Sequence, residues 1–147
     1  MKSDTTEISL NTILVHRPLR HTDKTPSGRI YSRELLEQFI NDWMTGGKTM
    51  FGTLGQTAYS RQAHVTDLSE VATIVIGMHV DDEGLVIQQQ MVDTPSGNIL
   101  LDLYKKDVTV NVLPRIIGRV DDEGNVYDAK LYGFYFDNGQ LPSTDVE

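Results

Sequence analysis

The sequence contains no cysteine among its 147 residues. This absence excludes a disulfide framework, a thiol nucleophile and a thiolate metal site. Basic residues are also scarce, because 13 Lys and Arg stand against 21 Asp and Glu, which gives a net charge of −8. Such a surface repels phosphate backbones and anionic lipid headgroups, so we expect binding to neither nucleic acid nor a membrane.

Long apolar runs are lacking as well. No segment approaches the roughly 20 apolar residues that a membrane-spanning helix needs, and the N-terminal residues MKSDTTEISL contain no apolar signal core. The remaining composition, 39% hydrophobic and 23% charged, is typical of a globular protein. The length predicts a single domain over 1–147, with its core at about 8–137, a polar N-terminal tip and a polar tail at 138–147.

Two segments have the spacing and the capping residues of helices. In the first, Ser32 is the expected N-cap, and Gly46 and Gly47 end the helix. The second begins at Thr94-Pro95, because proline suits the first turn of a helix. Its predicted inner face consists of Ile99, Leu100 and Leu103.

Alternating or continuous β-branched and apolar residues predict strands over seven segments: 8–15, 50–54, 71–80, 85–92, 108–112, 115–120 and 126–136. The polar residues 17–27, with two prolines, predict a loop. Since helices do not alternate regularly with these strands, we expect an α+β protein. Its architecture would be a mostly antiparallel sheet or barrel with two main helices.

Two short strings occur twice: Asp-Asp-Glu-Gly at 81–84 and 121–124, and Thr-Pro-Ser-Gly at 25–28 and 94–97. We interpret both as turn chemistry used twice, not as an internal duplication. A cation site formed by His79 with the first acidic string is disfavoured, because its carboxylates do not alternate as calcium ligands do. The prediction is therefore a solvated hairpin turn and no metal.

Ser60, His64 and Asp67 lie within eight residues and contain the side chains of a serine-hydrolase triad. Members of such triads usually come from distant segments, however, and are recognised by geometry. We therefore expect an exposed polar loop here and keep these three residues as an alternative catalytic set.

Four segments follow one another in an order that resembles the prohead (capsid maturation) proteases of tailed bacteriophages, whose fold is related to the herpesvirus assembly proteases. The segments are Ser27–Leu36, Gly52–Gln56, Thr94–Leu100 and Val108–Arg115. The resemblance covers about residues 10–138, and it implies the fold of that family for nearly the whole chain.

The resemblance also shows where this chain departs from the family. Gln56 stands at the position of the catalytic histidine, and Leu113 and Pro114 replace the nucleophilic serine and its serine neighbour, whereas Arg115 is retained. An amide cannot act as a general base, and an aliphatic side chain cannot attack a carbonyl. Proline also lacks the backbone N–H that an oxyanion hole needs.

These departures predict a catalytically inactive protein that is a virion structural or assembly component, such as a capsid decoration protein, a minor head protein or an assembly factor. Its expected partners are capsid or other virion proteins, and it would be present as a homo-oligomer or in many copies. It would need no cofactor, and it would be made in the cytoplasm of the bacterial host. One alternative is an active serine protease with a relocated nucleophile, Ser60 or Ser96, paired with His64 or His79. The other alternative is a non-viral peptide-binding module.

Overall fold

The computed structural model describes residues 7–55 and 68–137. Its elements, in chain order, are β1 (Ile13–Arg20), α1 (Arg33–Gly46), β2 (Phe51–Leu54), the 3-10 turn η1 (Leu68–Glu70), β3 (Val71–Val80), β4 (Gly84–Met91), α2 (Pro95–Lys105), β5 (Asn111–Val120) and β6 (Val126–Asp137). The two helices and the six-stranded sheet confirm the predicted α+β class.

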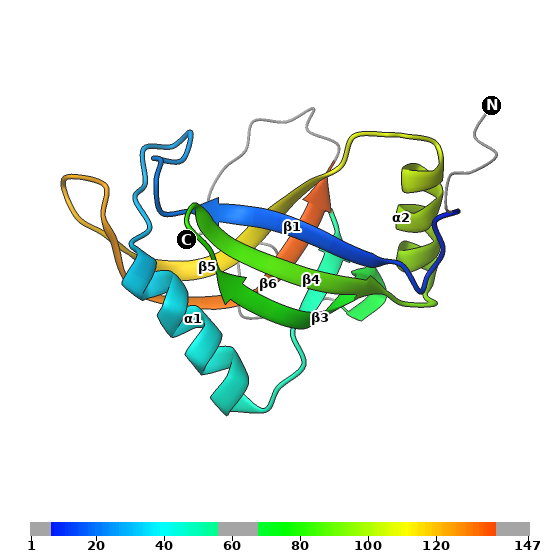
Figure 1. Cartoon of the computed structure of the whole chain (residues 1–147), viewed down its shortest axis with the longest axis horizontal. Coiled ribbons are helices and arrows are strands. Elements are labelled where there is room, and N and C mark those ends of the chain that lie inside the picture. Colours follow the sequence, from blue (N-terminus) through cyan, green and yellow to red (C-terminus); the bar gives the residue numbers. More distant parts are fainter. Residues whose placement is uncertain (1–6, 56–67, 138–147) are drawn as a thin grey trace.

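The six strands form one sheet in the order β1-β4-β3-β2-β6-β5. All neighbouring strands are antiparallel except β2 and β6, which are parallel. The sheet curls into a half-barrel, with β1, β4 and β3 forming the near wall in Figure 1 and β5 and β6 the far wall. The two edge strands, β1 and β5, thereby approach each other across the open side of the barrel.

Helix α1 covers one end of the half-barrel (Figure 1). Ser32 is its N-cap and accepts a hydrogen bond from the backbone N–H of Leu35, as predicted. The helix ends at Gly46, and Gly47 follows in the left-handed conformation, with a φ of 65°. The apolar side of α1 faces the barrel, and Leu36 and Phe39 belong to one buried cluster with side chains from four strands: Leu19, Leu85, Ile87, Ile116 and Phe134.

Helix α2 covers the opposite end of the half-barrel (Figure 1). Thr94 is its N-cap: the Thr94 hydroxyl accepts a hydrogen bond from Gly97 N–H and donates one to the carbonyl of Val71 on β3. Leu100 is fully buried against Phe136 and its neighbours. The predicted inner face is wrong at Ile99, whose side chain is 51% exposed, because Ser96 and Gly97 share the buried side of α2 with Leu100.

The first strand lies later in the chain than the alternation at 8–15 predicts, and it continues through part of the predicted loop to Arg20. The register of β1 against β4 shifts between His16 and Leu19, which identifies a bulge around Pro18. An edge strand accommodates a proline at such a bulge, because one side of the strand has no ladder to break. Leu19, only 2% exposed, then returns to the core.

The two strands predicted over 108–112 and 115–120 are one continuous strand, β5. Pro114 lies within it, paired with Phe134 of β6. This position is possible because β5 is the other edge of the sheet, where proline is tolerated. The predicted break at Pro114 is therefore wrong.

Both Asp-Asp-Glu-Gly strings form turns between antiparallel strands, as predicted. Asp81 Oδ1 accepts hydrogen bonds from the N–H groups of Glu83 and Gly84, both at 2.9 Å. Asp121 Oδ1 accepts from Glu123 and Asn125, again at 2.9 Å. In each turn the first aspartate holds the backbone that follows it, which is why the same string recurs.

Neither described helix has the length and apolar character needed to cross a membrane.

Candidate functional site

A groove of about 460 Å³ lies on the open side of the half-barrel. We call it the β1–β5 groove, because it lies between the two edge strands of the sheet. Its walls are formed by residues 16–20 of β1, residues 23–26 of the following loop, and residues 110–114 at the start of β5. The groove exists because the sheet ends at β1 and β5 without closing into a full barrel.

The positions that the resemblance assigns to the nucleophile and its neighbour lie in this groove. Leu113 and Pro114 both line the groove, and Leu113 is only 8% exposed to solvent. In the neighbouring strand β6, Leu113 pairs with Tyr135 and Pro114 with Phe134. The β5 wall of the groove therefore presents an aliphatic side chain and a residue without a backbone N–H donor.

Arg115, the next residue along β5, does not line the groove. Its side chain is 5% exposed and lies over Gly133 of β6, where an added Cβ atom would be 2.5 Å from the guanidinium Nη2. Burial lowers the pKa of this arginine, although a guanidinium stays protonated in proteins. Gly133 thus provides the space in which Arg115 packs inside the molecule.

His16 is a titratable residue on the opposite wall of the groove, and it is half-buried. Its ring packs edge-on against Phe136, with 6.1 Å between the ring centroids, and its Nε2 lies 3.3 Å from the hydroxyl of Tyr104 on α2. Its Nδ1 is buried, and no described residue gives it a hydrogen-bond partner. Burial lowers the pKa of His16 and raises that of Tyr104 to about 12. Both groups are consequently neutral at neutral pH.

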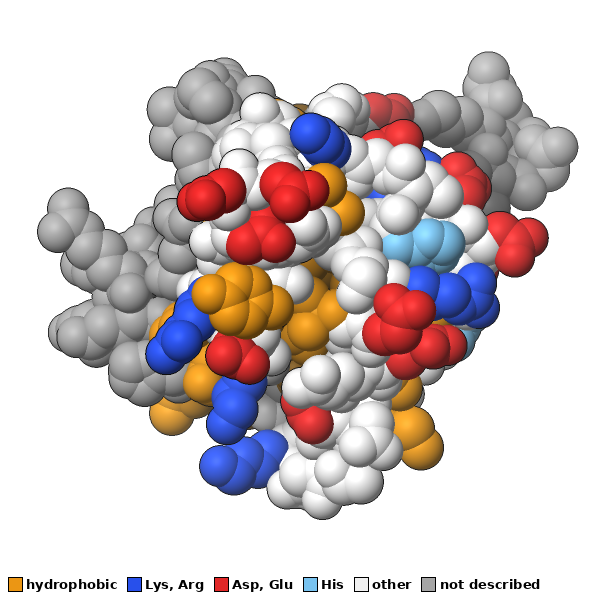
Figure 2. Space-filling model, turned by 90° about the vertical axis from the view of Figure 1, so that its left-hand side faces the viewer, with side chains coloured by type: hydrophobic (Ala, Val, Ile, Leu, Met, Phe, Trp, Pro, Cys, Tyr) orange, Lys and Arg blue, Asp and Glu red, His pale blue; other side chains and the backbone are white. Residues whose placement is uncertain are grey.

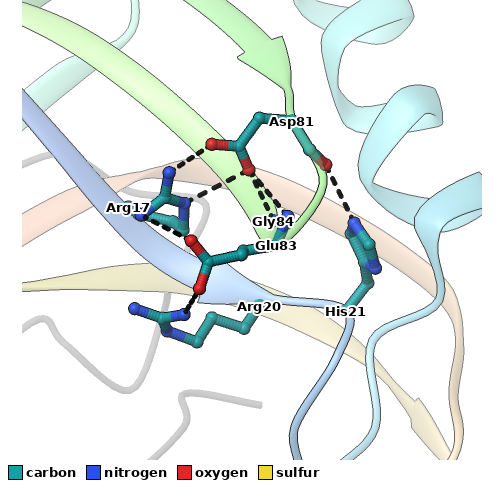
Figure 3. Close-up of polar contacts among 6 residues, drawn as sticks. All are labelled: Arg17, Arg20, His21, Asp81, Glu83 and Gly84. Atoms are coloured by element: carbon teal, nitrogen blue, oxygen red, sulfur yellow. Dashed lines mark hydrogen bonds and ion pairs between the residues drawn. The ribbon is translucent and has the colours of Figure 1, made fainter.

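A cluster of charged side chains fixes the end of β1 to the β3–β4 turn (Figure 3). We call it the turn clamp; its members are Arg17, Arg20, His21, Asp81 and Glu83. Arg17 binds Asp81 through two nitrogens, with a distance of 3.2 Å from Nε to Oδ1. Arg20 Nη1 donates to Glu83 Oε1 at 2.7 Å, and His21 Nε2 lies 3.0 Å from the carbonyl oxygen of Asp81.

The turn clamp engages two of the cations in the groove wall, Arg17 and Arg20. The Arg17 guanidinium, together with the N–H groups of Glu83 and Gly84, holds the pKa of Asp81 well below its usual range. Figure 2 views this end of the molecule and shows acidic and basic side chains gathered close together, with a histidine among them. The clamp therefore fixes the shape of the β1 wall without leaving an excess charge of one sign.

The described residues include only two of the remaining predicted site residues, Ser96 and His79, and neither lines the groove. Gln56, Ser60, His64 and Asp67 lie outside the described residues. Ser96 is buried in the first turn of α2, where its hydroxyl lies 3.4 Å from the carbonyl of Ser69, just before β3.

His79, the proposed partner of Ser96 in the alternative protease, lies near the opposite end of β3. At the rise of a β-strand, residues 71 and 79 are roughly 26 Å apart. A pair made of Ser96 and His79 is therefore excluded by the geometry of β3, since a nucleophile and its base must lie within hydrogen-bond distance. Among the described residues, no cluster of three or more His, Asp or Glu side chains offers a metal site either.

Comparison with known proteins identifies the fold. The capsid assembly protease gp21 of bacteriophage T4 superposes on this chain with a TM-score of 0.71, covering 84% of this chain and 80% of that one. The chain has a prohead-protease-like fold. The two sequences are only 18% identical, and neither a family model nor a curated protein matches the sequence. The prohead-protease-like fold inferred from four short segments is thus confirmed by the structure.

Sequence reasoning missed the residues that build the β1 wall of the groove. His16 directly follows the strand predicted over 8–15 and has no predicted role, and Arg17 belongs to the predicted loop over 17–27. The contacts that define both residues join distant parts of the chain: Tyr104 lies 88 residues after His16, and Asp81 lies 64 residues after Arg17. No local sequence motif predicts contacts between residues so far apart in the chain. The period of two places His16 on the same strand face as Leu14, but it does not identify the partners of that face.

Proposed function

We propose that this chain is a catalytically inactive relative of the prohead proteases that serves as a structural or assembly component of a bacteriophage virion. One observation carries the proposal: the chain has a prohead-protease-like fold, yet its β1–β5 groove presents Leu113 and Pro114, the positions where the resemblance places the nucleophile and its neighbour.

The chemistry of the groove supports this proposal. Leu113 offers no atom that can attack a peptide carbonyl, and Pro114 offers no N–H to stabilise an oxyanion. The neutral imidazole of His16 would be able to accept a proton, but it faces no hydroxyl or thiol at position 113. Gln56, which lies outside the described residues, replaces the family's histidine according to the resemblance, and its amide is not basic. Two catalytic groups would have to be recreated together for the same mechanism to operate.

The proposed setting follows from the solved structure to which the chain is similar, which is described as a capsid assembly protease. We propose that this chain likewise associates with capsid or other virion proteins, in many copies or as a homo-oligomer. Retention of the fold without the nucleophile is expected when the surface of a protein, and not its chemistry, is under selection.

The proposal is tested by following the protein during phage assembly. Proheads, mature heads and complete particles are separated on gradients from infected cells, and the protein is quantified in each fraction by mass spectrometry. We expect a fixed number of copies per particle in at least one of these fractions. Heads mixed with free purified protein and sedimented again are the control for non-specific adsorption. Absence of the protein from all particles and intermediates would contradict the structural role.

A further inference from the structure

A second groove, of about 780 Å³, lies beside the C-terminal part of α1. Its walls are formed by residues of α1 between 38 and 46, by residues 48–50 before β2, and by residues 130–132 of β6. We call it the α1–β6 groove. It shares no lining residue with the β1–β5 groove, so it is a separate surface of the molecule.

Aromatic side chains give the α1–β6 groove an apolar lining. Trp43, Phe51 and Tyr132 all line it, and all three are half-buried. Trp43 also packs against the main core cluster, which fixes its position. A lining of this kind, apolar with a few polar groups, is typical of surfaces that bury an apolar side chain of a ligand. Trp43 is the single tryptophan of the chain, so its fluorescence reports on this groove alone.

Two lysines set the charge of the α1–β6 groove. Lys48 and Lys130 line it, both are exposed, and no ion pair joins either of them to a carboxylate within residues 7–55 and 68–137. Asp42 is the acidic residue of the lining, so two positive charges and one negative charge leave a net charge of +1 in the groove. The whole chain carries a net charge of −8. The groove therefore attracts an acidic segment that most of the surface repels.

We infer that the α1–β6 groove binds residues 138–147 of the same chain, which lie outside the described residues. We call residues 138–147 the acidic segment; its sequence is NGQLPSTDVE. Leu141 and Val146 supply apolar side chains for the aromatic lining of the groove, and Asp145 and Glu147 supply carboxylates for the two lysines. The acidic segment contains no Lys or Arg that would oppose this contact.

The position of the acidic segment in the chain brings it within reach of the groove. The segment follows β6, whose residues 130–132 already form a wall of the groove. It begins with Asn138-Gly139, a dipeptide that favours a tight reversal of the chain. Lys130 lies seven residues before the end of β6, roughly 23 Å back along the strand. The eight residues after Gly139 span up to roughly 26 Å when extended, which is enough to reach Lys130.

Docking within one chain needs only weak contacts. A segment joined to its site by a short linker has an effective concentration in the millimolar range, so a contact that would be weak between separate molecules keeps the segment bound for a large part of the time. Exposed ion pairs are screened by salt, so we expect the acidic segment to be released as ionic strength rises. The inference concerns a surface outside the candidate site and does not rest on the proposed function.

The first experiment measures the quenching of Trp43 fluorescence by acrylamide in the full chain, because a docked segment shields the indole ring. Leu141→Asp, and the charge reversal Asp145→Lys combined with Glu147→Lys, should each raise the quenching constant about twofold, since an indole covered on one face becomes accessible on both. Added salt should raise the constant of the wild-type protein as well. Asp122→Lys, which reverses an exposed carboxylate in the β5–β6 turn, is the matched control and should leave the constant unchanged.

The second experiment locates the acidic segment directly. Because the chain has no cysteine, Thr49→Cys in the groove lining can be combined with Ser143→Cys in the acidic segment. In a glutathione redox buffer this pair should close to an intrachain disulfide, with an effective thiol concentration at least about tenfold above that of a control pair. The control pair is Thr109→Cys with Ser143→Cys. Thr109 is exposed and lies two residues before Asn111, the partner of Asp137, so it is nearer to the end of β6 than Thr49 is.

Three results would overturn the inference. The first is a quenching constant of the wild-type protein that equals those of the Leu141→Asp and charge-reversed chains. The second is closure of the Thr109 control pair as readily as the Thr49 pair. The third is a disulfide from the Thr49 pair that joins two chains, which would place the acidic segment in the groove of a neighbouring copy. In all three cases the proposed lack of catalysis would be unaffected.

Discussion

Arg17 and Asp81 form a two-point ion pair that joins the end of β1 to the β3–β4 turn, 64 residues further along the chain. The same carboxylate accepts two backbone N–H groups of its own turn. One side chain thereby holds both the hairpin and the edge strand that forms a wall of the β1–β5 groove.

The Asp81 contact predicts a dependence of stability on pH. Because the folded-state pKa of Asp81 is depressed, its contribution is fully present above the unfolded value of about 3.9 and is lost as the pH falls through the folded value. Asp81→Asn should therefore lower Tm at pH 7, and the difference from wild type should shrink below about pH 4. Thermal unfolding followed by circular dichroism across this range checks the prediction.

Asp82→Asn is the matched control for this measurement, since it neutralises the exposed neighbouring carboxylate in the same turn. It should change Tm much less than Asp81→Asn at pH 7. A Tm difference for Asp81→Asn that stays constant from pH 7 to pH 2.5 would show that the ion pair is not the cause.

His16 should titrate abnormally. Burial against Phe136 lowers its pKa, so its imidazole should remain neutral below the ordinary histidine value of about 6.5. The unfolded chain then binds this proton more readily, and stability should fall as the pH drops through 6.5 towards the folded value. Histidine ring resonances followed by NMR from pH 8 to pH 4.5, and assigned with His16→Phe, measure this titration. An unshifted or raised midpoint for His16 would contradict the burial argument.

Gly52 on β2 should tolerate no side chain. An added Cβ atom would collide with Thr73 Oγ1 and lie 2.7 Å from Gln89 Oε1, and both of these residues are fully buried. Gly52→Ala should cost about 1–3 kcal/mol of unfolding free energy by overpacking. Gly46→Ala is the control, because nothing lies within 4 Å of the new methyl group at the end of α1. Urea unfolding of both variants gives the comparison, and equal stabilities would contradict the packing described.

The Thr94 hydroxyl should stabilise α2 and its attachment to β3 together. Thr94→Ala removes both hydrogen bonds and should cost about 1–2 kcal/mol, or several degrees of Tm. Thr94→Ser keeps the hydroxyl and should recover most of the loss. If serine and alanine variants unfold at the same temperature, the hydroxyl contributes nothing.

Local chemistry made much of this fold predictable. Ser32 and Thr94 have the side chains that cap a helix, and the two Asp-Asp-Glu-Gly strings bond to their own backbone, so both kinds of feature follow from neighbouring residues. The position of β1 was not predictable in this way. Arg17 and Pro18 resemble loop residues, and they are held in an edge strand only by a bulge and by carboxylates distant in sequence.

In the candidate site, too, some residues could be predicted from the sequence and others could not. Leu113 and Pro114 were found through the order of four short segments, and the structure places both in the β1–β5 groove. His16 and Tyr104 were not assigned to the site, because β1 and α2 approach each other only once the sheet has curled. A pattern with a period of two identifies the face of a strand, but not what lies opposite that face.

The most direct test of the central proposal is a search for peptidase activity in the purified protein. The protein is incubated with capsid and scaffold proteins of a tailed bacteriophage and, separately, with a serine-directed fluorophosphonate probe, and both reactions are examined by intact-mass spectrometry. We predict uncut proteins and no labelling, because the aligned positions carry Leu113 and Gln56. Cleavage, with labelling that disappears in Ser60→Ala or Ser96→Ala, would contradict the proposal and identify an active protease with a relocated nucleophile.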